Sequence, residues 1–193
     1  MILSQSFYNR PTLNVAQDLL GCFLIRKIDN QLLKTKIIEV EAYPGPHDLA
    51  CHASKGCTPR NKVMFGSAGH IYVYFTYGMH YLLNIVTENK NYPAAVLIRA
   101  IDPLNKGSDG DLKAIVKSTN GPAKLTKFLK IDKSFYSLPI YQKKSGLWIE
   151  SRKEEIEEKN IVKTARIGID YAKEYKDKPW RFYIKDNFFV SKK

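Results

Sequence analysis

Two glutamates, Glu39 and Glu41, stand in an otherwise apolar stretch of the chain. Side chains of a β-strand alternate between two faces, so Ile38, Val40 and Ala42 are expected on one face and both acids on the other. Two interpretations stay open at this point. Both acids lie on a solvated sheet face and pair with lysines, or the strand delivers one carboxylate to a cleft, where it acts as a general base.

An arginine, Arg99, interrupts a second apolar stretch at residues 94–100, which has the composition of a strand buried on both faces. Burying a guanidinium without an anionic partner is prohibitive. We therefore predict that Arg99 pairs with an acid, and Glu41 is the expected partner.

Length and charge limit the class of protein. The chain has 193 residues, the ordinary size of one domain with one core. Lysine and arginine number 31 against 19 acids, a net charge of +12, and 12 residues are tyrosines. This balance favours a partner that is a polyanion with bases to stack, namely nucleic acid, although a generally lysine-rich protein has the same charge.

The three cysteines, Cys22, Cys51 and Cys57, do not form a disulfide framework. Cys51, His52 and Cys57 place soft ligands close together, but no second pair completes a tetrahedral zinc set, so we predict no metal. The N-terminus has no secretion signal, and no run is long enough to span a bilayer. A reducing cytoplasm, or the nucleus of a eukaryote, is the expected location.

The remaining pattern predicts a strand-rich middle with few helices. A helix at residues 13–20 should end at Gly21, and the turn Asp29-Asn30 should join strands at residues 22–28 and 32–43. A loop at residues 44–62 has the composition of a functional loop. Further strands are expected at residues 71–77, 94–100, 147–149, 163–169 and 180–184, with a helix at residues 121–129.

The strand at residues 71–77 carries Tyr72 and Tyr74 on one face and ends in Tyr77 before Gly78. A rigid aromatic side chain at an exposed hairpin tip is able to act as a wedge between base pairs. Ordinary core packing of a tyrosine-rich strand is the alternative.

Together these residues resemble the alkyladenine (3-methyladenine) DNA glycosylase family, the monofunctional purine-excising enzymes of base-excision repair. Similar blocks run in the family's order over nearly the whole chain. They are EVEAY at residues 39–43, GP at 45–46, Asp48, His52, TPRN at 58–61, MF at 64–65, GHIYVYFTYGMHYLLN at 69–84, VLIRA at 96–100, GPAKL at 121–125, ARIGI at 165–169 and WRFY at 180–183. The segment at residues 103–119 departs from the family by being shorter and poorer in arginine.

The resemblance implies roles for individual residues. Glu41 deprotonates the water that attacks C1′ of the damaged nucleotide, and Arg99 orients that water or its base. Tyr77, with Met79 beside it, fills the gap that the flipped nucleotide leaves in the DNA. Four residues are expected to form the base pocket. Tyr43 and Tyr74 sandwich the base between their rings. His52 hydrogen-bonds the base, and Asn84 excludes the 2-amino group of guanine. Residues that contact the DNA backbone or shape the site are Arg60, Lys124 and Arg166.

The expected fold is a mixed α/β (α+β) single domain over residues 1–193, with a curved, largely antiparallel sheet, peripheral helices and a protruding β-hairpin. The expected partner is double-stranded DNA holding alkylated or deaminated purines, bound by a monomer, and neither a metal nor an organic cofactor is implied. Two rivals remain: a protein that bends nucleic acid without chemistry, and a metal-dependent nuclease with Glu39 and Glu41 as cation ligands.

Overall fold

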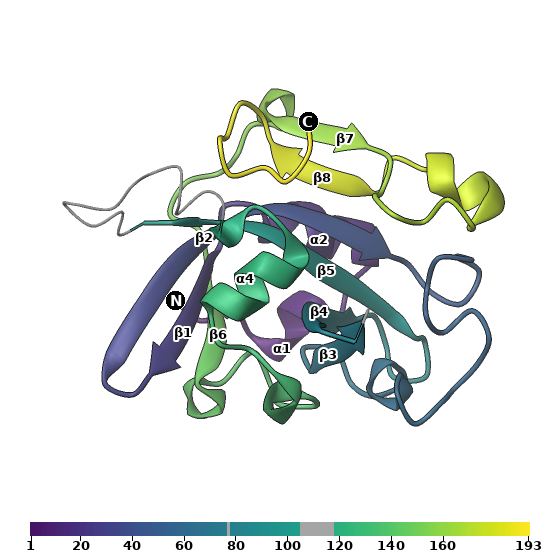
Figure 1. Cartoon of the computed structure of the whole chain (residues 1–193), viewed down its shortest axis with the longest axis horizontal. Helices are drawn as coiled ribbons and strands as arrows, with labels where there is room; N and C mark the ends of the chain where they lie inside the picture. Colours follow the sequence, from purple (N-terminus) through teal and green to yellow (C-terminus); the bar gives the residue numbers. More distant parts are fainter. Residues whose placement is uncertain (77, 105–117) are drawn as a thin grey trace.

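The sheet is organised around one long strand, β2 (Gln31–Tyr43). The computed structural model describes residues 1–76, 78–104 and 118–193. Within these ranges every strand pair is antiparallel, in the order β3-β4-β5-β2-β1-β6, and β7 and β8 form a ribbon that joins β2 through β8 (Figure 1). The other strands are β1 (Phe23–Ile28), β3 (Ile71–Thr76), β4 (His80–Thr87), β5 (Ala94–Pro103), β6 (Leu147–Glu150), β7 (Ile161–Thr164) and β8 (Arg181–Ile184).

Strand β2 changes its neighbour halfway along its length. Its first half pairs with β1, and residues 39–41 pair with β8, while β5 follows its other edge. The second half therefore lies inside the sheet, and both Glu39 and Glu41 are fully buried. The interpretation that these acids lie on a solvated face is wrong.

The β2–β5 pair is irregular where the acids stand. Ile37 pairs with Ile101 and Val40 pairs with Ile98, but the register gives Ile38 and Arg99 no partner. Such bulges redirect side chains. Ile38 packs with Ala100, Phe189 and Val190 and does not join the core cluster of Val40 and Ala42 as simple alternation predicted.

Three α-helices lie on the periphery of the described chain (Figure 1): α1 (Gln5–Tyr8), α2 (Thr12–Leu19) and α4 (Pro122–Phe128). Helix α2 buries Val15, Ala16 and Leu19 in the main core. Gly21 follows it with φ +79°, which confirms the predicted glycine after the helix. Short 3-10 helices occur at Lys62–Phe65, Lys133–Phe135, Lys143–Ser145, Glu158–Asn160 and Lys173–Asp177.

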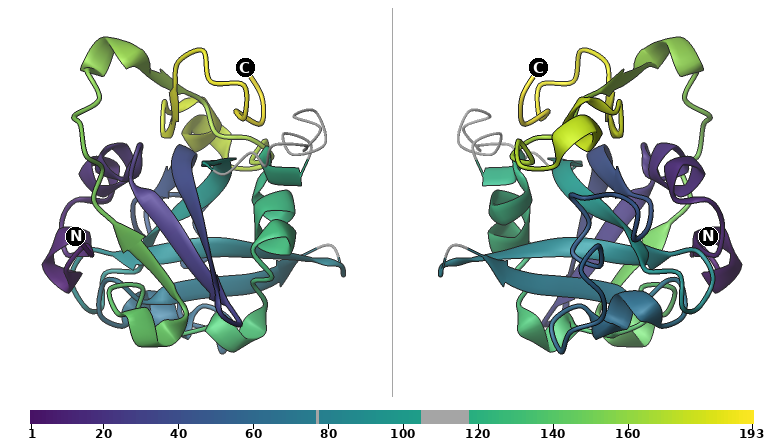
Figure 2. Two further views of the ribbon diagram at one scale, coloured as in Figure 1. Left: turned by 90° about the vertical axis from the view of Figure 1, so that its left-hand side faces the viewer. Right: turned by 90° about the vertical axis from the view of Figure 1, so that its right-hand side faces the viewer.

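The β3–β4 pair extends beyond the rest of the sheet at one side of the molecule (Figure 2). Its strands pair antiparallel, from Ile71 opposite Ile85 to Thr76 opposite His80. Tyr77 lies outside the described residues, as do residues 105–117 of the segment that departs from the family. The protruding hairpin tip stays a prediction.

The described chain is one α+β domain with a curled antiparallel sheet and few helices, as the sequence predicted. One strand was placed wrongly, because β7 ends at Thr164 and residues 165–169 form a loop beside β2. No helix in the described ranges is long and apolar enough to cross a membrane.

Candidate active site

A cavity of about 310 Å³ opens where the end of β2 meets β3, β4, β5 and the loop that follows β7. This volume is at the lower end of the range for small-molecule pockets. Its walls combine aromatic and aliphatic side chains with polar groups. The lining residues are Glu41, Tyr43, Ala50, His52, Met64, Tyr72, Tyr74, Thr76, Leu82, Asn84, Ala95, Leu97, Arg99, Pro122, Ile167, Gly168, Ile169 and Tyr171.

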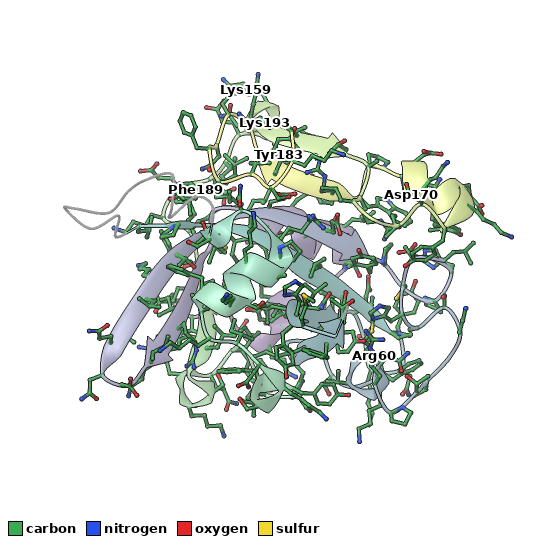
Figure 3. All side chains as sticks on the ribbon, viewed as in Figure 1. Arg60, Lys159, Asp170, Tyr183, Phe189 and Lys193 are labelled. Atoms are coloured by element: carbon green, nitrogen blue, oxygen red, sulfur yellow. The ribbon has the colours of Figure 1, made fainter. Side chains whose placement is uncertain are left out.

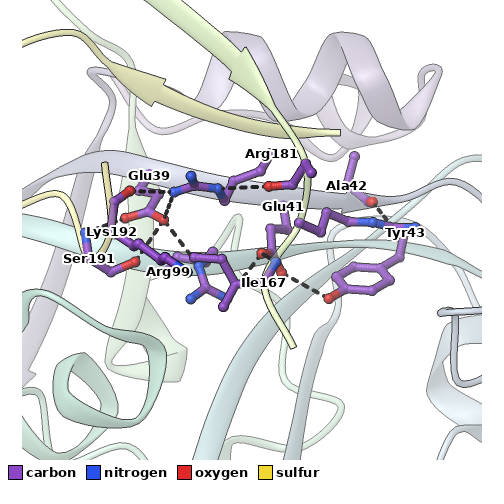
Figure 4. A network of polar contacts seen from close by, with 11 residues as sticks. Glu39, Glu41, Ala42, Tyr43, Arg99, Ile167, Arg181, Ser191 and Lys192 are labelled. Atoms are coloured by element: carbon purple, nitrogen blue, oxygen red, sulfur yellow. Dashed lines mark hydrogen bonds and ion pairs between the residues drawn. The ribbon is translucent and has the colours of Figure 1, made fainter. Parts of the chain in front are cut away.

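Glu41 is the acid in this lining. Its Oε1 accepts a hydrogen bond from the backbone N–H of Ile167 at 2.8 Å and lies 3.1 Å from Nη1 of Arg99 (Figure 4). Its Oε2 accepts a hydrogen bond from the Tyr43 hydroxyl at 2.9 Å. A carboxylate oxygen has two lone pairs, so Oε2 retains acceptor capacity toward the cavity.

Glu39 faces the opposite side of Arg99 and does not line the cavity. Its Oε1 accepts from Nε of Arg99 at 3.1 Å, Nη1 of Arg181 at 2.8 Å and the Ser191 hydroxyl at 2.8 Å, and its Oε2 accepts from the Ser191 N–H at 2.6 Å (Figure 4). Glu39 thus binds three side chains, from Arg99, Arg181 and Ser191, and lies outside the cavity lining, which makes it a structural anchor.

Arg99 therefore bridges both acids from its bulged position, rather than pairing with Glu41 alone. Burial acts to lower the pKa of Arg99, but the charges of Glu41 and Glu39 raise it above its ordinary value, so the guanidinium stays charged. With Arg181 the cluster holds two cations and two carboxylates. The charges balance, as a buried ionic group requires.

Three rings form the aromatic wall. The His52 ring centroid lies 4.5 Å from that of Tyr74, and the Tyr72 and Tyr74 centroids are 5.3 Å apart. Nδ1 of His52 and the Tyr72 hydroxyl share a hydrogen bond of 2.8 Å. Although part of His52 is exposed, desolvation of its ring and the charge of Arg60 lower its pKa to about 4, so His52 is neutral at pH 7.

Three phenols of the cavity, those of Tyr43, Tyr72 and Tyr74, stay protonated at neutral pH. Burial, followed by the charge of Glu41, raises the pKa of Tyr43 well above its usual value, and burial also raises the pKa of Tyr72 and Tyr74. Tyr43 is consequently a hydrogen-bond donor to Glu41 at neutral pH.

Two asparagines fix this wall. The Asn84 amide donates to the carbonyl of Tyr72, its cross-strand partner, at 3.1 Å. The buried Asn61 amide donates to the carbonyls of His52 and Gly56 at 2.9 Å each. Asn61 therefore holds the loop that carries His52 against the cavity.

Comparison with known proteins gives a family to this geometry. The family described as Methylpurine-DNA glycosylase (MPG) matches residues 6–188. The chain belongs to this family. Proteins named "Putative 3-methyladenine DNA glycosylase" align with the whole chain: 44% identical in Bdellovibrio bacteriovorus and 47% in Carboxydothermus hydrogenoformans, both over their full length, and 45% in Methanocella arvoryzae over 96% of its length.

Membership of the methylpurine-DNA glycosylase family supports a DNA repair glycosylase activity and DNA as the binding partner. The recognition made from the sequence is thereby confirmed. The roles of individual residues are not carried by these names.

The structure brings together six of the residues singled out in the sequence. All six line one cavity, although they come from β2, β3, β4, β5 and the loop after β2. They are Glu41, Tyr43, His52, Tyr74, Asn84 and Arg99. Their shared location is consistent with the predicted site, while each role stays a prediction.

The residues predicted to contact DNA lie around this cavity rather than in it. Arg60 is exposed, with its guanidinium carbon 4.9 Å from the Tyr74 ring centroid, and Lys124 is exposed and donates to the Asn120 side chain. Met79 is 68% exposed. Figure 3 shows Arg60 well separated from the C-terminal residues Phe189 and Lys193.

Arg166 lies in the interior of the protein and not on the surface, where a contact with the DNA backbone would require it. Its side chain is fully buried, where Nη2 donates to Asp48 Oδ1 at 2.8 Å and Nη1 donates to the Ala42 carbonyl at 2.9 Å. Its guanidinium also stacks on the rings of Tyr43 and Trp180. A buried arginine with a bidentate partner is unable to grip a phosphate, so Arg166 fixes the loop next to Glu41 instead.

Sequence reasoning missed residues that the fold brings to the cavity. Ile167 supplies a backbone N–H to Glu41, and Tyr72 holds His52. Tyr171 lines the cavity although it is 67% exposed. The ARIGI block at residues 165–169 pointed to Ile167, but this segment was predicted as a strand and its loop conformation was missed.

Metal ligands do not gather in the described ranges: no three side chains of His, Cys, Asp or Glu come close enough together to hold an ion. Cys51 is buried and its thiol contacts the Pro93 carbonyl, whereas Cys57 is exposed.

Proposed function

We propose that the chain hydrolyses the N-glycosidic bond of damaged purines in duplex DNA and leaves an abasic site. The damaged purines are alkylated or deaminated bases of the 3-methyladenine, 7-methylguanine, hypoxanthine and ethenoadenine class. The carrying observation is that Glu41 is fully buried yet lines an aromatic cavity with one oxygen not saturated by protein donors. The whole chain acts as one glycosylase domain and as a monomer.

In this proposal Oε2 of Glu41 holds the attacking water. The water oxygen bonds to C1′, its proton passes to Glu41, and the electron pair of the glycosidic bond leaves with the base. The Ile167 N–H and Arg99 hold the other oxygen, so the carboxylate keeps one orientation during the transfer. An oriented general base contributes roughly 10²- to 10⁴-fold to a rate.

The aromatic wall is proposed to receive the flipped base between Tyr43 and Tyr74, next to His52. Stacking is worth about 1–3 kcal/mol per base, which offsets much of the cost of unstacking a poorly paired lesion. Asn84, fixed by its bond to the Tyr72 carbonyl, is proposed to exclude the 2-amino group of guanine. Tyr77 and Met79 fill the gap in the duplex, and Arg60 and Lys124 contact its backbone.

Leaving-group chemistry decides whether the site must supply a proton to the departing base. Alkylation at N3 or N7 makes the purine cationic, so it departs as a neutral base without a proton donor. Neutral lesions need a proton as well, and His52 has a pKa of about 4, which leaves it unprotonated at neutral pH. His52 is therefore proposed to be a hydrogen-bonding partner of the base and not its general acid.

The rival functions fit the geometry less well. A metal-dependent nuclease would need Glu39 and Glu41 to face one cation, but the guanidinium of Arg99 stands between them. A protein that only bends DNA has no need for a buried carboxylate in a cavity.

The test is base release from a duplex with one 3-methyladenine, hypoxanthine or ethenoadenine, in chelator, with strand breakage scored before and after alkali. Wild-type protein should release the base, and the DNA strand should break only when alkali is added. Glu41→Gln should reduce the single-turnover rate by about 10³-fold while it still binds lesion DNA.

The control for this test is Ser134→Ala, because Ser134 is exposed and does not line the cavity; this variant should release base like wild type. If Glu41→Gln keeps wild-type rates, Glu41 is not the base. If wild-type protein binds damaged DNA tightly but releases nothing from any of these substrates, the DNA-bending function replaces the proposal.

A further inference from the structure

The last residues of the chain close over the carboxylate of Glu39. Phe189 and Val190 are buried against Ile38 and Ala100, where the β2–β5 bulge turns Ile38 away from the main core. This hydrophobic cluster fixes the backbone at the point where Ser191 begins.

Ser191 binds Glu39 through two donors. Its N–H donates to Oε2 at 2.6 Å and its hydroxyl donates to Oε1 at 2.8 Å (Figure 4). The next residue is fixed as well, because Nη1 of Arg181 donates both to Glu39 and to the Lys192 carbonyl, at 2.8 Å each. Hydrogen bonds to a buried carboxylate are among the stronger ones in proteins.

These contacts continue to the cavity. Oε1 of Glu39 binds the Ser191 hydroxyl and also Nε of Arg99 at 3.1 Å, and Nη1 of Arg99 lies 3.1 Å from Glu41. Three donors, from Arg99, Arg181 and Ser191, share Oε1 of Glu39. Without the Ser191 hydroxyl, Oε1 would keep Arg99 and Arg181 as donors, and a closer contact between Glu39 and Arg99 would draw the guanidinium away from Glu41.

We propose that Ser191 is a positioning residue: through Glu39 it sets where Arg99 stands relative to Glu41. It has no contact with the cavity and acts only through this chain of contacts. The inference rests on the proposed function, since it is Glu41 that would hold the water.

The test is Ser191→Ala, which removes the hydroxyl and keeps the N–H. We expect the single-turnover rate of base release to fall about 10-fold, with affinity for lesion DNA within about twofold of wild type. Ser191→Thr restores a hydroxyl and should recover most of the rate. Equal thermal unfolding midpoints of the three proteins establish that they are folded alike.

A matched control is available in Ser134, whose N–H and hydroxyl both donate to Asp132 at 2.8 Å and 2.6 Å on the surface. Ser134→Ala removes the same kind of hydrogen bond and should leave the rate unchanged. An unchanged rate in Ser191→Ala overturns the proposal, and so does weaker DNA binding at an unchanged rate, because the tail would then be a DNA contact.

A second readout does not depend on activity. The ¹⁵N NMR signal of Nε–H of Arg99, assigned by its loss in Arg99→Lys, should shift in Ser191→Ala and return in Ser191→Thr. If wild-type protein releases no base, the proposed function fails while this measurement still decides whether Ser191 and Arg99 are coupled. No shift in Ser191→Ala overturns the coupling.

Discussion

Glu39 and Glu41 stand two residues apart on one strand, are equally buried and contact the same arginine, yet their surroundings differ completely. Glu39 is closed in by Arg181 and Ser191. Glu41 is held by the Ile167 N–H and Tyr43 and opens on a cavity. The difference arises from what covers each end of Arg99, so Glu39 is enclosed by protein donors while Glu41 lines the cavity.

The sharpest way to break this comparison is to remove what the two acids share. Arg99→Met keeps much of the side-chain volume but leaves Glu41 without a cation and Glu39 with Arg181 alone. Removing one partner of a buried ion pair typically costs 3–5 kcal/mol, so we expect a loss of about 4 kcal/mol in the free energy of unfolding. Urea unfolding at pH 7 measures it. A loss below about 1 kcal/mol would mean that the cluster adds little to stability.

Comparing the two acids one at a time gives the next largest effect. Glu39→Gln removes the charge that binds Arg99, Arg181 and Ser191, and should lower the free energy of unfolding by about 3 kcal/mol. Glu41→Gln leaves Arg99 paired with Glu39 and should lower it by less than half as much.

The losses in the rate of base release should rank in the opposite order to the losses in stability. Glu41→Gln should release base far more slowly than Glu39→Gln. Urea unfolding and single-turnover kinetics on the same two preparations measure both quantities. Equal losses of stability and of rate in the two variants would mean that the acids are not specialised.

The smallest predicted effect concerns the desolvated wall on the Glu41 side. The pKa of His52 is about 4 in the folded protein, against an ordinary value of about 6.5. Between these values the unfolded chain binds a proton at His52 and the folded chain does not, so this residue reduces stability as the pH falls from 6.5 to 4.

His52→Gln removes this proton binding. The stability of wild type relative to His52→Gln should therefore decline between pH 7 and pH 4.5, measured by urea unfolding at each pH. The partial exposure of His52 keeps the effect small. A constant difference would show that the ring is solvated.

Much of the fold was predictable because strands and helix ends depend on residues that are close together in the sequence. The apolar stretch around Arg99 predicted its ion pair with Glu41, and Gly21 follows helix α2 as expected, whereas the second ion pair of Arg99, with Glu39, was not predicted. The bulge was not predictable, since no residue type marks it, and for this reason Ile38 was placed on the wrong face.

The site was predictable only in part, for a related reason. The family resemblance supplied the residues that share a cavity, but it did not reveal burial. Nothing in the sequence around Arg166 indicates that it is buried, because its partner Asp48 is brought to it only by the fold. Two partners of Glu39, Arg181 and Ser191, come from β8 and the tail, 142 and 152 residues later in the chain.

The balanced charge of the cluster affects how the protein should respond to ionic strength. Two arginines and two glutamates cancel inside the protein, where dissolved ions screen little, whereas the net charge of +12 that attracts DNA acts through solvent. Added salt should therefore weaken DNA capture steeply and leave the rate of base release from the bound complex nearly constant. Salt concentration is thus a control that acts on how often the enzyme meets DNA and not on what it does there.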